Sequence, residues 1–311
     1  MTNNNYPTLY RCADATSIKA QNTYLLLNKV YLGLLVLGSL ISAFATILSP
    51  TINNYLYIGL AAVLVVGLFI FWVMRARKDE KIWFDSRAVA ESVKTATWRF
   101  MMGIPPFHEE STAEAIFIDN LKEIREARPH LGKHLAAEMN ADGSAITEFM
   151  KRMQTSSLEE RRDFYLKARI RDQKTWYTKK ARSNADYGNR WFWIILFLQV
   201  LIMIIAIFQA IYGGCRINPI PIITTCAAAL AAWSQIKRHD ELAQSYALAA
   251  QELDEIEAIA NNQASEDTFA HIVDQAEISI SREHTMWCAR RDVSLSKQSG
   301  ANPRMGSQTH G

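Results

Sequence analysis

The stretch WFWIILFLQVLIMIIAIFQAIY, residues 191–212, contains no charged side chain and is apolar around almost its whole helical surface. A helix of about 20 such residues crosses the hydrocarbon core of a bilayer. Three further charge-free blocks have the same character: residues 30–48, 55–74 and 217–236. The connections within each pair are too short for a domain. We therefore predict an all-α polytopic membrane protein whose four spans form two helical hairpins.

Basic residues set the expected orientation of these spans, because Lys and Arg near span ends remain in the cytoplasm. They flank the span ends at Lys29, Arg75, Lys179 and Lys237, whereas the two hairpin tips hold only Arg216. We expect a multi-pass protein of the inner membrane. Both termini and the polar middle region should be cytoplasmic.

Composition and motifs argue against several classes of protein. The chain has 34 Lys and Arg against 31 Asp and Glu, so no basic excess indicates nucleic acid. No cysteine spacing, phosphate-binding loop or nucleophile motif points to chemistry. His130, His134 and Glu138 could share a helix face, but Pro129 and Gly132 interrupt that helix and favour a solvated surface. We predict no enzyme, no cofactor and no bound metal.

Helical extensions continue from both hairpins into the polar regions. No Gly or Pro occurs inside residues 75–102, which predicts one continuous amphipathic helix after the second span. After the fourth span, apolar residues alternate at steps of four and three, as in a coiled-coil seam. The seam consists of Leu242, Tyr246, Ala249, Leu253, Ile256 and Ala260. We expect Leu242, Tyr246, Leu253 and Ile256 to join copies of the chain.

The same organisation occurs twice: a cytoplasmic helix, a hairpin of two spans and another cytoplasmic helix. We place a first module at residues 1–155, a second at residues 156–292 and a disordered, polar tail at residues 293–311. Further cytoplasmic helices are expected at residues 111–128, 146–153, 158–185 and 265–290.

A few polar side chains interrupt the spans. They are Ser42 and Thr46 in the first, Gln199 and Gln209 in the third, and Thr224 and Thr225 in the fourth. An amide in hydrocarbon needs a partner, so these groups either bond across helices or face water in a pore. The sequence leaves both readings open. No ionisable residue lies inside any span, which argues against a proton relay or a charge-coupled transporter.

One string of residues is more distinctive than its surroundings. Residues 83–99 read WFDSRAVAESVKTATWR and are followed by MGIPPF at residues 102–107. Within the string, Arg87 and Glu91 are four residues apart on one helical face, with Lys94 nearby. This face either fixes packing or forms a polar lock that a ligand or partner disturbs. Trp83, Arg87, Glu91, Lys94 and Trp98 are therefore our candidates for a packing or switch role.

This string resembles the SLATT superfamily, bacterial two-span proteins proposed as membrane effectors. The second half is similar to the partner module of tandem SLATT proteins through RDQKTWYTKKA, YALAAQEL and EHTMW, at residues 171–181, 246–253 and 283–287. Together the resemblance covers roughly residues 10–290. It implies an effector of a bacterial conflict or antiphage system, switched on by a separate protein that makes or senses a nucleotide signal.

Two functional hypotheses follow. In the first, the chain forms a homo-oligomer in the lipid bilayer and, when triggered by a partner encoded nearby, opens a pore or disrupts the membrane. In the second, it is a non-conducting scaffold or sensor that acts through its coiled-coil-like cytoplasmic helices.

Overall fold

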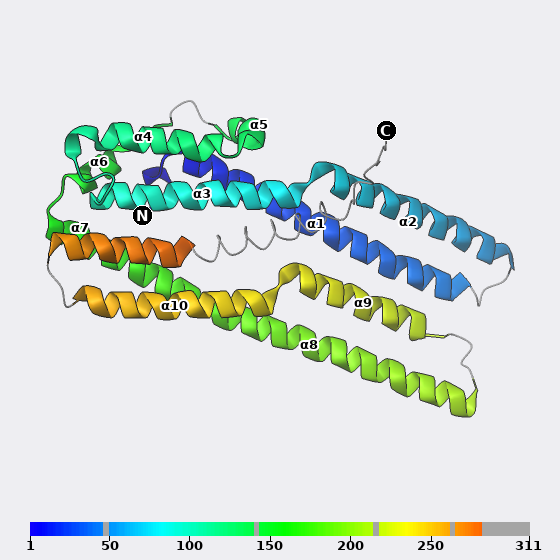
Figure 1. The fold of residues 1–311 in the computed structure, drawn as a ribbon. Helices are drawn as coiled ribbons and strands as arrows, with labels where there is room; N and C mark the ends of the chain where they lie inside the picture. Colours follow the sequence, from blue (N-terminus) through cyan, green and yellow to red (C-terminus); the bar gives the residue numbers. More distant parts are fainter. Residues whose placement is uncertain (46–49, 140–142, 214–217, 262–264, 282–311) are drawn as a thin grey trace, which may run out of the picture.

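The computed structural model describes residues 1–45, 50–139, 143–213, 218–261 and 265–281. Within these ranges every regular element is a helix and no strand occurs. Two long hairpins project side by side from a helical end, so the molecule is elongated (Figure 1). We call residues 30–45, 52–74, 191–212 and 220–236 the apolar end. The remaining described residues form the polar end.

The helices divide into two halves of the chain. The first half contains α1 (Thr8–Ala45), α2 (Pro50–Arg77), α3 (Asp79–Met102), α4 (Glu110–Glu126), α5 (Gly132–Ala137) and α6 (Glu148–Gln154). The second half contains α7 (Leu158–Tyr165), a π-helical segment (Leu166–Arg171), α8 (Asp172–Tyr212), α9 (Ile220–Lys237), α10 (His239–Asn261) and a helix over residues 266–281. The segments predicted as cytoplasmic helices overlap α4, α6, α7, the start of α8 and the helix over residues 266–281.

Local sequence signals explain several of these boundaries. The side chains of Thr147 and Ser157 accept hydrogen bonds from the backbone N–H groups of Met150 and Glu160, each at 3.3 Å, and so cap α6 and α7. Gly103 follows the last residue of α3 with φ +61°, a left-handed conformation that Gly adopts without a steric penalty.

The halves share one order of helices at their cores. In the first, α1 and α2 form a hairpin, and α3 continues in the direction of α2 and packs along the N-terminal part of α1. In the second, α8 and α9 form a hairpin, and α10 continues in the direction of α9 and packs along the N-terminal part of α8 (Figure 1). The organisation expected from the sequence is therefore present twice in space, although α3 and α10 differ in sequence.

The extension predicted over residues 75–102 is helical but not straight. α2 ends at Arg77 and α3 begins at Asp79, and Lys78 between them is left-handed with φ 53°. The second half has the same feature, because Arg238 has φ 50° between α9 and α10. For a residue other than Gly, the left-handed conformation costs about 1–2 kcal/mol. Neither break involves Gly or Pro, which is why the sequence did not predict them.

At the apolar end the helices lie in an open row. α1 contacts both α2 and α9, and α9 contacts α8, whereas α2 and α8 do not pack against each other in the described chain. Figure 1 shows this order, α2, α1, α9, α8, from top to bottom. The exposure of α1 agrees with it: Leu37, Leu40 and Phe44 are exposed on one face, and Leu35 and Ser42 on the opposite face. A helix in the middle of a closed bundle would have one exposed face at most.

Three helical stretches are long and apolar enough to cross a membrane: Thr8–Ala45, Ile52–Met102 and Leu158–Tyr212. In the second and the third stretch, no residue of the most apolar 18-residue window is buried. The 18 residues of α9 are not among them; α9 spans about 27 Å at 1.5 Å per residue and includes Gln235 and Lys237. Exposed apolar surface on this scale requires lipid or a partner.

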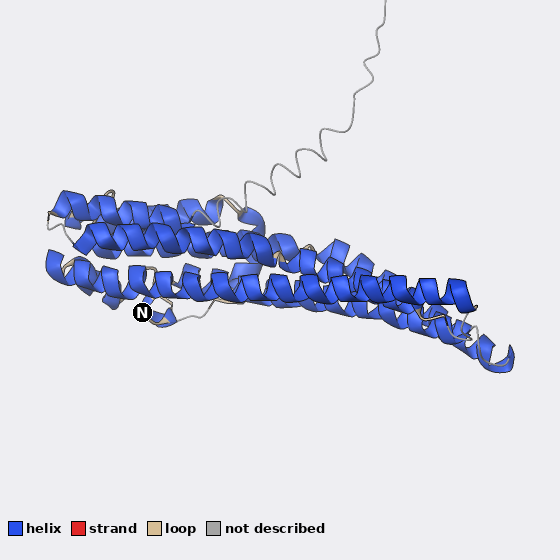
Figure 2. Cartoon of the chain, turned by 90° about the horizontal axis from the view of Figure 1, so that it is seen from below, coloured by secondary structure: helices blue, strands red, loops and turns tan. Residues whose placement is uncertain are grey.

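The hydrophobic core lies at the polar end, which Figure 2 shows as a thick bundle tapering into the hairpins. The 266–281 helix packs there between α3 and the α7–α8 region, and joins the two halves. The largest fully buried apolar side chains of this core are Trp98, Tyr165, Phe100, Phe117, Met101 and Met102.

Candidate functional site

The polar residues of the spans occupy different surfaces. Gln199 is exposed on α8, and its amide bonds to no residue that the structure describes. Gln209 is half-buried and donates to Asn218 Oδ1 at 3.4 Å. Thr225 donates to the Pro221 carbonyl at 2.8 Å within its own helix, whereas Thr224 is exposed. Ser42 is exposed on α1, and Thr46 lies outside the described residues. These groups therefore do not converge on one channel inside a single chain.

The candidate oligomer seam is occupied within the chain. Leu253 is 0% exposed, and Tyr246 and Ile256 pack against the same core. Their main neighbour is α8, with which α10 makes one of the largest helix contacts in the molecule. Tyr246 lies 5.3 Å from the Trp176 ring and 5.7 Å from the Tyr177 ring, measured between ring centroids. Contacts between copies through these residues would have to displace this packing.

The Trp83 to Trp98 string forms one side of α3 and has two environments. Trp98 is buried in the core, where its indole N–H donates to the Tyr6 hydroxyl at 3.2 Å. Arg87 forms ion pairs with Glu91 at 2.7 Å and with Asp14 of α1 at 3.6 Å. Trp83, Arg87, Glu91 and Lys94 line a cavity. Whether they act as a switch stays a prediction, but four of the five candidates lie on one wall.

This cavity, which we call the inter-half cavity, has a volume of about 590 Å³. Helices α1 and α3 of the first half form one side of it. Helices α8, α9 and α10 and the 266–281 helix of the second half form the other. It runs from Lys94 in the polar end to Ile236 and Lys237 at the boundary with the apolar end. Side chains of both halves therefore meet around one space next to the spans.

A buried ion pair lies beside the cavity and was not anticipated from the sequence. Arg169 and Glu277 are each 1% exposed, and the guanidinium donates to both carboxylate oxygens, from Nε at 2.8 Å and from Nη2 at 2.7 Å. Glu277 also accepts from Tyr165 at 3.0 Å and from Thr95 of α3 at 2.8 Å. Burial, followed by the Glu277 charge, raises the pKa of Tyr165 well above its ordinary value, so the phenol stays protonated and donates.

This cluster ties the two halves together. Thr95 comes from α3, Tyr165 and Arg169 from the α7 and π-helical segment, and Glu277 from the 266–281 helix. Arg169 also lies 5.6 Å from the centroid of the Trp98 ring, over which a cation is attracted. A π-helical segment at this point matters, because such segments are frequent at functional positions. No short-range pattern could have revealed a pair separated by 108 residues.

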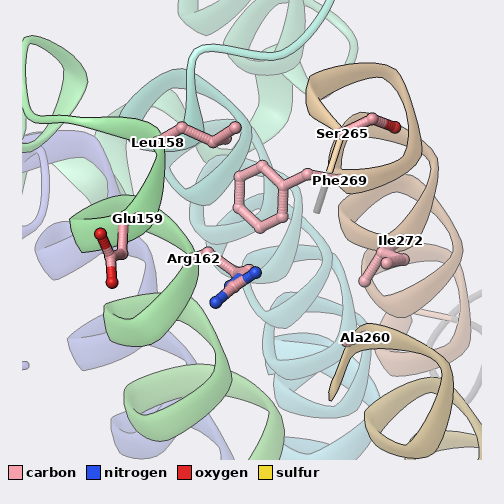
Figure 3. Close-up of a pocket in the computed structure, with 7 residues that line it drawn as sticks. All are labelled: Leu158, Glu159, Arg162, Ala260, Ser265, Phe269 and Ile272. Carbon is pink, nitrogen blue, oxygen red and sulfur yellow. The ribbon is translucent and has the colours of Figure 1, made fainter. Parts of the chain in front are cut away.

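A second pocket, of about 320 Å³, lies between the start of α7, the end of α10 and the 266–281 helix. Figure 3 shows the Phe269 ring pointing toward Leu158, with the carboxylate of Glu159 turned away from it. Its walls are mostly apolar, and Arg162 provides the one cationic side chain among the described residues that line it. This pocket is smaller than the inter-half cavity and has fewer convergent polar groups.

The three residues weighed as metal ligands bind elsewhere in the fold. His130 Nε2 lies 2.9 Å from the buried carboxylate of Asp85. Glu138 pairs with Lys19 at 3.0 Å, and the His134 carbonyl accepts from Thr16 at 3.4 Å. No group of three or more His, Cys, Asp or Glu side chains in the described ranges could hold a metal ion.

Comparison with known families gives two matches that divide the chain. The family model described as SMODS and SLOG-associating 2TM effector domain 3 matches residues 7–162. The model described as SMODS and SLOG-associating 2TM effector domain 1 matches residues 165–287. No curated protein and no solved structure gave a match. The matched segments contain, respectively, the α1–α2–α3 unit and the α8–α9–α10 unit.

Proposed function

Because the chain belongs to the SMODS and SLOG-associating two-transmembrane effector (SLATT) family, with one domain in each half, we propose that it is a membrane effector of a bacterial conflict system. Effector domains of this family are associated with conflict and antiphage systems. In the proposal, four spans cross the inner membrane at residues 30–48, 55–74, 191–212 and 217–236, and both termini are cytoplasmic. A nucleotide signal or a sensor protein encoded nearby triggers the chain to open a pore or disrupt the bilayer.

The observation that carries the proposal is the open row of helices at the apolar end. A row has two free edges, α2 and α8, and two free faces, so the described helices of one chain do not close around a common space. Assembly of several copies edge to edge would close such rows around a common space. Cyclic assemblies are a common form of homo-oligomer. The absence of charged residues within the spans agrees with a pore that passes solutes without a proton relay.

Gln199 supports the same assembly. Its amide is exposed on α8, the edge of the row, and finds no bond among the described residues. In hydrocarbon an unsatisfied amide is unfavourable, and cross-helix bonds of this kind contribute about 0.6–2 kcal/mol. A second copy or a water-filled pore would supply the missing partner. The scaffold alternative is less well supported, because the α10 seam on which it relied already packs against α8.

The proposal is tested by inducing the full chain together with its neighbouring operon products and measuring membrane potential and dye entry. We expect rapid depolarisation. Q199L should weaken it severalfold, whereas Q209L, the same change on the same helix, should have a smaller effect because Gln209 bonds within the chain. An unchanged membrane potential and permeability in the wild type would refute the effector role. Equal effects of both substitutions would refute assembly through the Gln199 face.

A further inference from the structure

The inter-half cavity has the size of a small-molecule site. Pockets for such ligands are usually about 300–1,000 Å³, and this one has about 590 Å³. It is also the larger of the two pockets described above, and its walls come from six helices rather than from one loop. Helical walls hold binding groups in fixed positions.

The charges that line the cavity are unbalanced. Arg87 is paired with Glu91, but Lys94, Lys180 and Lys237 form no salt bridge with any residue in the described ranges. Lys174 provides a comparison on the same helix as Lys180. Outside the cavity its ammonium binds both Asp254 and Glu257, at 2.9 and 2.5 Å. The fold therefore pairs a lysine with carboxylates where α8 meets α10, and leaves three lysines without a salt bridge in the described ranges where the halves meet.

Of the three lysines, Lys94 lies in the least favourable environment for a positive charge. Burial is the main cause that lowers the pKa of its ammonium, and the nearby charges of Arg169 and Arg87 lower it further, against the opposing effect of Glu91 and Glu277. A cation held in such a place without a bonded acceptor is stabilised by any anion that enters. Surface lysines, which are solvated, have no such need.

Aromatic rings line the same space. Trp83, Trp176 and Tyr246 all face the cavity, and the Trp176 side chain is 38% exposed despite its contacts with Tyr177 and Tyr246. Lys180 lies 5.7 Å from the centroid of the Trp176 ring, so a ring and a cation are presented together. Flat ligands, nucleobases among them, stack on exposed indoles and phenols.

From the unpaired lysines and the aromatic wall, we propose that the inter-half cavity binds a phosphate-bearing ligand with an aromatic ring, which is a nucleotide by chemical class. Its phosphate oxygens bind the ammonium groups of Lys94 and Lys180. Its ring packs on the wall formed by Trp83, Trp176 and Tyr246. The assignment of this ligand as the trigger rests on the proposed effector function, whereas binding itself does not.

The position of the cavity provides a route from ligand to spans. Each half reaches the cavity through the helix that follows its hairpin, α3 in the first half and α10 in the second. Those helices join α2 and α9 through the single left-handed residues Lys78 and Arg238. A ligand that pulls the two sides together changes the angle between the two hairpins and so the exposure of the α2 and α8 edges.

A phospholipid headgroup has the same phosphate chemistry, and Ile236 and Lys237 line the end of the cavity nearest the apolar end. The test therefore uses the full-length protein in nanodiscs of zwitterionic lipid only. Equilibrium dialysis measures binding of radiolabelled ATP, GTP and cyclic di-AMP, with inorganic tripolyphosphate as the probe without a ring. A second set of nanodiscs contains 30% anionic lipid as a competitor.

We expect at least one nucleotide to bind, and tripolyphosphate to bind at least tenfold more weakly. K94Q should weaken nucleotide binding at least tenfold and W176L severalfold. K122Q, the same change on exposed α4, should leave the dissociation constant within twofold. Circular dichroism of each variant checks that it is folded. W176L tests the aromatic wall separately, because it removes a ring and leaves the charge of the cavity unchanged.

Several outcomes would overturn the inference. The first is a wild type that binds no nucleotide in zwitterionic nanodiscs, or that binds tripolyphosphate as tightly as a nucleotide. The second is an equal effect of K94Q and K122Q on nucleotide binding. The third is loss of nucleotide binding in nanodiscs with anionic lipid because the lipid headgroup occupies the cavity, which would make this a headgroup site. A protein that depolarises cells but binds no nucleotide refutes this inference alone. A protein that binds a nucleotide but never changes permeability refutes the effector function alone.

Discussion

Replacing Glu277 by Gln should destabilise the polar end more than any other single loss of charge. The carboxylate is 1% exposed and accepts four hydrogen bonds, two from Arg169 and one each from Tyr165 and Thr95. The amide has one acceptor oxygen, and its NH₂ faces the guanidinium donors. The change therefore leaves the Arg169 cation buried without a counter-charge. Removing one partner of a buried pair costs about 3–5 kcal/mol.

The assay is urea unfolding of the full chain in detergent micelles, followed by tryptophan fluorescence, because Trp98 lies 5.6 Å from the Arg169 guanidinium. With an m-value of about 1–3 kcal/mol per molar, a loss of about 3–5 kcal/mol lowers the urea midpoint by about 1–5 M. E114Q is the matched control. Glu114 pairs with Lys151 at 2.8 Å, but the two side chains are 49% and 41% exposed, and such pairs contribute about 0–1 kcal/mol.

A double variant separates an unpaired charge from a general defect. R169M alone should also destabilise, since it leaves the buried Glu277 carboxylate with only two neutral donors. In R169M/E277Q no charge is left unpaired, and the amide still provides an acceptor and a donor for Tyr165 and Thr95. We expect the double variant to regain most of the loss, with a coupling free energy of at least about 2 kcal/mol. Additive losses, or a loss below about 1 kcal/mol in E277Q, would refute the reasoning.

Two further predictions concern the seam and a junction residue. L253A should lower the free energy of unfolding by about 2–5 kcal/mol, because the Leu253 side chain is 0% exposed. Its urea midpoint should not depend on protein concentration, because the seam packs against α8 of the same chain. A concentration-dependent loss would instead indicate that the seam joins copies of the chain. For His239, burial and then Lys237 lower the pKa below its ordinary value near 6.5. Between the folded and unfolded pKa values the unfolded chain binds more protons, so stability should fall as pH drops below about 6.5. Thermal unfolding of H239Q from pH 8 to pH 5 should lack this dependence, and an identical dependence in both proteins would contradict it.

The sequence predicted most of the architecture because its strongest signals are local. Charge-free blocks located the apolar helices, and step patterns located α4, α6, α7 and α10. The breaks at Lys78 and Arg238 escaped prediction, since no Gly, Pro or Asn marks them. In the first half, Arg77 bonds the Asp79 carboxylate across the break, from Nε at 2.8 Å. That contact is visible only once the backbone conformation is known.

The candidate site was predicted in part and for a similar reason. The string at residues 83–99 was distinctive enough to mark Trp83, Arg87, Glu91 and Lys94, which line the cavity. The opposite wall is formed by residues about 80 to 200 positions away in the sequence, and no periodicity connects the two walls. A heptad seam likewise predicts that a helix packs against another helix, but it does not identify that helix. The sequence favoured another copy of the chain for α10, whereas the structure places α8 there.

The arrangement of polar groups suggests how the two halves could respond to one ligand. At the far side of the cavity, the Arg169–Glu277 cluster fixes the π-helical segment to α3 through Thr95. Near the spans, the halves meet where α1 contacts α9, and there Lys29 and Lys237 lie 5.2 and 5.5 Å from the centroid of the Trp233 ring. The cavity lies between these two points of attachment. Closing it around an anion would therefore rotate one half against the other about these two attachments. Most of the movement would appear at α2 and α8, the edges of the row that no other described helix covers.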